Sequence, residues 1–118
     1  MGSIQAYFGF LEFPGFSRIW GKLGLTDHDL AVLQFSILQD PEAAPVVTGC
    51  GGARKIRFAA AGTTKGKSGA YRCIYKFLKN HGIIVLVAIY PKSMQVTLSE
   101  SDKKRFTAAI SAIDHELS

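Results

Sequence analysis

The run from Ile83 to Tyr90, IIVLVAIY, constrains the fold more than any other stretch of this chain. It is too short to span a bilayer as a helix, and its branched side chains favour a β-strand. A strand that is apolar on both faces has to be covered on both faces. The run therefore predicts the central strand of a sheet with packing elements on either side.

A hairpin partner precedes this run. The segment from Tyr71 to Lys79 is rich in aromatic and branched residues, as strands are. The short polar turn Asn80-His81-Gly82 then connects it to Ile83. Two strand-like segments joined by such a turn predict an antiparallel β-hairpin.

The segment from Arg54 to Ala60 is expected to add a third strand. Because successive side chains of a strand point to opposite faces, Ile56, Phe58 and Ala60 should share one face. Lys55 and Arg57 should share the other. The pattern predicts a half-buried antiparallel strand whose outer face is cationic.

Two helices are predicted to cover the sheet. The first spans residues 26–39, with Thr26 as its N-cap and Asp40-Pro41 at its end. Its apolar residues recur at helical spacing, at Leu30, Leu33, Ile37 and Leu38. The second spans residues 99–117, where Ser99 and Asp102 form a capping box. Its apolar stripe consists of Phe106, Ala109, Ile110 and Ile113.

The remaining N-terminal segments give weaker signals. Phe8, Phe10 and Leu11 favour a first strand within residues 1–12, although the start Met1-Gly2-Ser3 is also typical of a tag-derived sequence. A short helix is expected from Ser17 to Lys22. With 118 residues the chain has room for one modest core, so residues 1–118 should form a single domain. The predicted class is α+β: N-terminal helices, a sheet of three to four strands that is antiparallel or mixed at one edge, and a C-terminal helix.

Charge is distributed unevenly along the chain. Residues 1–42 contain five acids and two bases, residues 43–99 contain nine bases and no acid, and residues 100–118 contain four acids and three bases. A localised excess of positive charge favours binding of a polyanion, since each neutralised phosphate releases counterions. A solvated basic surface without a partner is the simpler interpretation of the same pattern.

Several other classes of function are disfavoured. The two cysteines lack the spacing of a zinc site, and the acid-free segment lacks the carboxylates of a metal-dependent nuclease. The three histidines are interpreted as surface residues, so no metal and no cofactor is expected. The segment from Gly62 to Ser68 does not have the glycine spacing of a phosphate-binding P-loop. The helix over residues 26–39 contains no Arg or Lys, which disfavours a DNA recognition helix. No signal peptide pattern is recognised, so a cytoplasmic location is expected.

Cations alone can support cleavage of RNA. The ribose 2′-OH attacks the adjacent phosphorus, the 5′-oxygen leaves and a 2′,3′-cyclic phosphate forms. Fixed Arg and Lys groups stabilise the charge that develops on the phosphoryl oxygens, and a lysine crowded by arginines is a candidate acid or base. The candidate catalytic residues are Lys55, Arg57, Arg72 and Lys92. Candidate RNA-binding residues are Arg54, Lys65, Lys67, Tyr71, Lys76 and Tyr90, with Tyr71 or Tyr90 stacking a base; Tyr75 is expected in the core.

The glycine-rich and basic pattern resembles the HigB branch of the RelE-type bacterial toxins. The matching segments are Gly49-Cys50-Gly51-Gly52-Ala53-Arg54-Lys55-Ile56-Arg57-Phe58-Ala59, Gly66-Lys67-Ser68-Gly69-Ala70-Tyr71-Arg72-Cys73-Ile74-Tyr75 and Tyr90-Pro91-Lys92. The resemblance spans roughly residues 25–115. The chain departs from the family pattern at Leu98, where some members have a catalytic tyrosine, and at Pro91 within the last motif.

This resemblance implies a metal-free endoribonuclease that cuts mRNA on the ribosome and is held inactive by a cognate antitoxin of the HigA or RelB kind. Lys55 and Arg57 would be strand cations, Arg72 a phosphate clamp and Lys92 a late-strand cation, while Lys65 and Lys67 would grip RNA. The alternative is a non-catalytic RNA-binding or regulatory module of the same fold. A protein that only binds a partner is a third interpretation, which leaves the acid-free segment unexplained.

Overall fold

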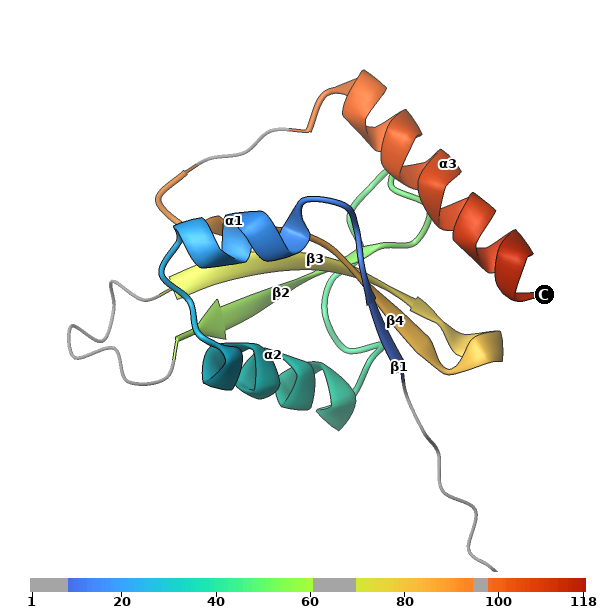
Figure 1. The fold of residues 1–118 in the computed structure, drawn as a ribbon. Helices are drawn as coiled ribbons and strands as arrows, with labels where there is room; N and C mark the ends of the chain where they lie inside the picture. The colour runs from blue at the N-terminus through green and yellow to red at the C-terminus, as the bar shows by residue number, and fades with distance from the viewer. Residues whose placement is uncertain (1–8, 61–69, 95–97) are drawn as a thin grey trace, which may run out of the picture.

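The structure of the chain is a computed structural model, which describes residues 9–60, 70–94 and 98–118. Within these ranges the chain forms strand β1 (Gly9–Glu12), helices α1 (Phe16–Lys22) and α2 (Asp27–Gln39), strands β2 (Arg54–Ala59), β3 (Ala70–Leu78) and β4 (Ile83–Pro91), and helix α3 (Glu100–Leu117). A 3-10 turn over Lys79–His81 connects β3 to β4. The predicted α+β class and the order of its elements are confirmed (Figure 1).

The strands form one sheet in the order β1-β4-β3-β2. The strands β2, β3 and β4 are antiparallel neighbours, whereas β1 pairs with β4 in parallel, so the sheet is mixed at this edge. Strand β4 therefore has a partner on each side, as its apolar sequence predicts. The register between β3 and β4 shifts between Ile74 and Tyr75.

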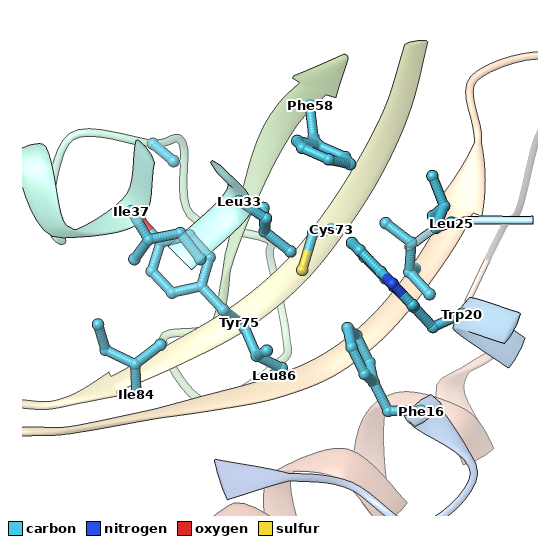
Figure 2. Packing of buried hydrophobic residues seen from close by; sticks show 12 residues of the cluster. Phe16, Trp20, Leu25, Leu33, Ile37, Phe58, Cys73, Tyr75, Ile84 and Leu86 are labelled. Atoms are coloured by element: carbon cyan, nitrogen blue, oxygen red, sulfur yellow. The ribbon is translucent and has the colours of Figure 1, made fainter. Parts of the chain in front are cut away.

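One face of the sheet carries an aromatic core that α1 and α2 cover (Figure 2). Leu33 and Ile37 from α2 are fully buried there, and Tyr75 from β3 is fully buried beside them. Trp20 stacks between Phe16 and Phe58, with ring centroids 5.8 Å and 5.7 Å away. This face thus buries large rings that connect α1 to the edge strand β2.

The opposite face is covered over only part of its length. Helix α3 lies on the side of the sheet opposite to α2 (Figure 1) and packs Ile110 into a second cluster that contains Ile74, Leu78, Val85 and Val87. The turn before β2 contributes Cys50 and Ala53 to the same cluster. On the side of Ile74 away from this cluster, the same face is less covered, and the cations of β2 and β3 can be exposed there.

Both long helices begin with the predicted caps. Thr26 accepts a hydrogen bond from the N–H of Asp29, and Asp29 accepts one in return from the N–H of Thr26. Ser99 and Asp102 form the same reciprocal capping box at the start of α3. Such boxes satisfy main-chain donors that a helix start otherwise leaves unpaired. Among the helices of the described ranges, none has the length and hydropathy to cross a membrane.

Candidate nucleic-acid interface

A row of residues crosses three strands on the partly uncovered face. Arg57 of β2 lies opposite Arg72 of β3, and Arg72 lies opposite Tyr90 of β4. Lys55 lies two residues before Arg57, opposite Ile74. Because alternate residues of a strand share a face, Lys55, Arg57 and Arg72 project from the face that carries Ile74. The structure therefore brings together three of the four predicted catalytic residues.

These three cations line one depression of about 310 Å³, together with Pro45. Lys55 and Arg57 are exposed, whereas Arg72 is half-buried and donates a hydrogen bond to the main-chain oxygen of Tyr71 at 3.2 Å. The ion pairs found within the described residues involve none of the three. The lining of the depression is thus positive and includes no carboxylate.

The directly opposed arginines are unfavourable for folding. Like charges on residues that face each other across a strand pair destabilise a sheet, and Arg57 and Arg72 are such a pair. Local conflicts of this kind between sequence and stability are concentrated at functional sites. An anion bound between the two guanidinium groups would remove the repulsion, and the planar guanidinium suits two phosphate oxygens at once.

Lys92 and Tyr90 extend the row toward the end of β4. The N–H of Lys92 donates to the carbonyl of Ala70 at 3.1 Å, which places its backbone one row beyond Arg72. Lys92 does not line the depression. Tyr90 is half-buried and packs against the cluster under α3, on the same face as Arg72. Of the two tyrosines considered for stacking, Tyr90 is the one on the cationic face.

Arg54 and Tyr71 lie on the other face of the sheet. Arg54 donates from Nη1 to the carbonyl of Ala44 at 2.8 Å and is half-buried. Tyr71 packs against Phe58, with ring centroids 6.2 Å apart. Their positions suit bracing and packing, and they do not join the row of cations.

The remaining predicted RNA-binding lysines are not part of the depression. Lys76 lies four residues beyond Arg72 on β3, and its ammonium group lies close to Gly52. Gly52 has a positive φ of 88°, which side chains rarely adopt, so this turn favours glycine. Lys65 and Lys67, with the rest of the segment Gly62–Ser68, lie outside the described residues.

Two buried groups near the row are held in their neutral forms. Burial raises the pKa of the Cys73 thiol, which disfavours the reactive thiolate. Burial also raises the pKa of Tyr75, an effect that the charge of Arg54 partly opposes. The neutral phenol donates a hydrogen bond to the carbonyl of Pro41 at 2.8 Å. Tyr75 is therefore a core residue, as expected, and it also holds the loop that follows α2.

The described histidines do not form a metal or nucleophile site. No group of three or more metal-binding side chains is found within the ranges that the structure describes. His81 is half-buried and pairs with Asp114 through Nε2 at 2.8 Å, and Ser118 Oγ lies 3.4 Å from the same nitrogen. In a catalytic relay, a carboxylate orients the histidine through one ring nitrogen and the hydroxyl is activated by the other. Asp114 and Ser118 instead share the same nitrogen of His81. His28 and His115 are exposed, in agreement with the prediction.

Sequence reasoning missed the role of Pro45 and its neighbours. The N–H of Lys55 donates to the carbonyl of Pro45 at 2.9 Å, and Val46 forms a bridge with Arg54. Pro45 thereby becomes a wall of the depression, although a loop following a helix gives no pattern that would indicate this. The nearest signal in the sequence was the acid-free segment, which begins just after Glu42.

These elements define a small α+β domain with a cationic row on a half-covered sheet face. No family model matches the sequence. The structure is similar to that of a mutant of the Escherichia coli toxin RelE in the free state, in which two arginines are replaced by alanine. The TM-score is 0.53 at 14% sequence identity, over 87% of this chain and 96% of that chain. The chain therefore has a RelE-like fold.

Proposed function

We propose that this chain is the toxin of a toxin–antitoxin pair, of the HigB kind, and that it cleaves mRNA bound to the ribosome in the cytoplasm. The single observation that carries the proposal is the depression lined by Lys55, Arg57 and Arg72. The RelE-like fold supports it, and so does the motif pattern of residues 49–59. The expected partners are mRNA, the ribosome and an antitoxin protein.

The proposed reaction uses the RNA as its own nucleophile. The 2′-oxygen forms a bond to phosphorus, the bond to the 5′-oxygen breaks, and the products end in a 2′,3′-cyclic phosphate and a 5′-hydroxyl. Arg57 and Arg72 hold the phosphoryl oxygens, where fixed cations stabilise the charge of the transition state. Arginine keeps its proton in proteins, so Lys55 is the member of this trio that can exchange a proton with the RNA. The reaction as proposed includes no metal or cofactor.

The test is to induce the chain alone in cells and map new 5′ ends on transcripts, with purified protein and RNA in the presence of a chelator as a second assay. Arg72→Ala should lower the cleavage rate by about 100- to 1,000-fold, as loss of one transition-state donor does elsewhere. Lys55→Ala should abolish growth arrest. Both variants should remain folded and unfold in a single cooperative transition, so that lost activity is not lost structure.

The matched control is Lys79→Ala, which removes one cation from the turn at the opposite end of β3 and should leave cleavage unchanged. Cleavage that persists in both Lys55→Ala and Arg72→Ala would contradict the assignment of the site. RNA binding with steep salt dependence but without cyclic-phosphate product would instead identify a non-catalytic RNA-binding module.

A further inference from the structure

A second depression, of about 270 Å³, adjoins the cationic one at the outer edge of β2. The two depressions share three lining residues, Pro45, Lys55 and Arg57. The second one continues past them to the end of α2 and to Ile56, on the other side of the strand. A ligand that places a phosphate in the first depression can therefore extend an adjoining group into the second.

The outer wall of this second depression is held rigidly. Three hydrogen bonds fasten residues 41–45 to the sheet: Tyr75 Oη to the Pro41 carbonyl at 2.8 Å, Arg54 Nη1 to the Ala44 carbonyl at 2.8 Å, and the Lys55 N–H to the Pro45 carbonyl at 2.9 Å. A wall fixed before binding loses little conformational entropy when a ligand arrives. The second depression is thus a preformed feature, and it gives Arg54 a positioning role although it lies off the cationic face.

This depression combines apolar walls and hydrogen-bond acceptors with the cations Lys55 and Arg57, which it shares with the first depression. Ser36 and Gln39 each donate to the helix carbonyl four residues earlier, at 3.0 Å and 3.1 Å. One oxygen of Asp40 accepts from the N–H of Glu42 at 3.1 Å, and its other oxygen has no partner among the described residues. Ser36 and Asp40 can therefore only accept further bonds, while Gln39 retains its amide oxygen and one amide N–H.

We infer that this second depression binds the nucleobase next to the scissile phosphate and favours a base with an exocyclic amino group over uracil. The inference rests on the proposed function, since the phosphate is placed by Lys55 and Arg57. The acceptors match the amino donors of adenine, cytosine and guanine, in the way that carboxylates accept from cytosine N4. Uracil presents a carbonyl oxygen on either side of its single N–H. With Lys55 and Arg57 engaged by the phosphate, these oxygens would face Asp40 and Ser36 unfavourably. Ala43, Pro45 and Ile56 provide apolar surface for the plane of the base.

The test measures binding of 2′-O-methyl trinucleotides, which lack the nucleophile and cannot be cleaved. Each position carries A, C, G or U in turn, and affinity for the whole chain is measured by fluorescence anisotropy at one fixed salt concentration. At one position, the bases with amino groups should bind about tenfold more tightly than uracil. Asp40→Asn, which keeps the shape and adds a donor, should reduce this ratio to about one.

Glu42→Gln is the matched control, because Glu42 is a carboxylate on the same loop that does not line the second depression. It should retain the full preference, and Ser36→Ala should lose part of it. Equal affinity for all four bases, no measurable binding, or an undiminished preference in folded Asp40→Asn and Ser36→Ala would each overturn the inference. Cleavage is scored separately on natural RNA. A preference among the bases without cleavage would refute only the proposed enzymatic activity. Cleavage without a preference among the bases would refute only the proposed base-binding site.

Discussion

The sheet face that carries Arg72 is built in two different ways at its two ends. At one end α3 covers it, and Ile74, Leu78, Val85 and Val87 are buried against Ile110. At the other end the same strands carry Lys55, Arg57 and Arg72 around an open depression. One end gains free energy from apolar burial, while the other places two arginines opposite each other at a cost in stability. Apolar burial and clustered cations are thus separated along single strands.

The boundary between the two ends lies at Ile74. Its side chain is buried under the α3 cluster, its register partner Lys55 belongs to the depression, and Arg72 comes two residues before it on the same face. A substitution on the covered side of this boundary should therefore lower stability without lowering activity, and one on the cationic side should lower activity without lowering stability.

The largest effect on stability is expected from Ile110→Ala. Ile110 is 4% exposed and is the only buried residue of α3, all of whose residues the structure describes. Truncation of such a side chain leaves a cavity and costs about 2–5 kcal/mol of unfolding free energy. Urea unfolding measures this loss. The control is Leu117→Ala, at a side chain that is 41% exposed, which should change stability by less than about 0.5 kcal/mol. Equal losses of unfolding free energy in the two variants would show that burial of Ile110 does not stabilise the covered end more than an exposed residue of the same helix does.

A smaller effect of opposite sign is expected from Arg57→Gln. Removing one of two opposed positive charges should raise the unfolding free energy by about 0.2–1 kcal/mol, and the gain should shrink at high salt. A double-mutant cycle with Arg72→Gln isolates the repulsion between the two residues. If Arg57→Gln is destabilising and the cycle shows no coupling, the cationic end carries no conflict between stability and function.

Much of this arrangement was predictable from alternation and composition. The central position of β4 follows from its apolar run, and the common face of Lys55 and Arg57 follows from the period of a strand. Both capping boxes depend on an acid placed three residues after Thr26 or Ser99. The sequence predicts the box at Ser99 and only the N-cap at Thr26. These features are local, so a single segment is enough to reveal them.

The position of Tyr90 was not predictable in this way. Strict alternation along β4 would place Tyr90 with Ile84 and Leu86, in the aromatic core. The shift of register between β3 and β4 inserts one extra residue, and Tyr90 then shares a face with Val85 and Arg72. A bulge depends on the partner strand and leaves no mark in the apolar run itself. The wall at residues 41–45 was not predictable for a similar reason. Three hydrogen bonds from residues of β2 and β3 hold it, from the side chains of Tyr75 and Arg54 and from the main chain of Lys55.

The smallest effect sharpens the comparison at the start of α3, where the covered end begins. Hydrogen bonds from Arg105 and then from Ser99 hold the pKa of the Asp102 carboxyl below its ordinary value of 3.8. A carboxyl whose pKa is lower in the folded state stabilises the fold above its unfolded pKa and loses this contribution as pH falls through the folded pKa. Stability should therefore decline below about pH 4 by a small amount that Asp102→Asn removes, as seen in unfolding curves measured between pH 5 and pH 2. The cation row contains no carboxyl, so Arg57→Gln should leave this acid-dependent part unchanged. An acid-dependent loss that persists undiminished in Asp102→Asn would show that the cap of α3 does not set it.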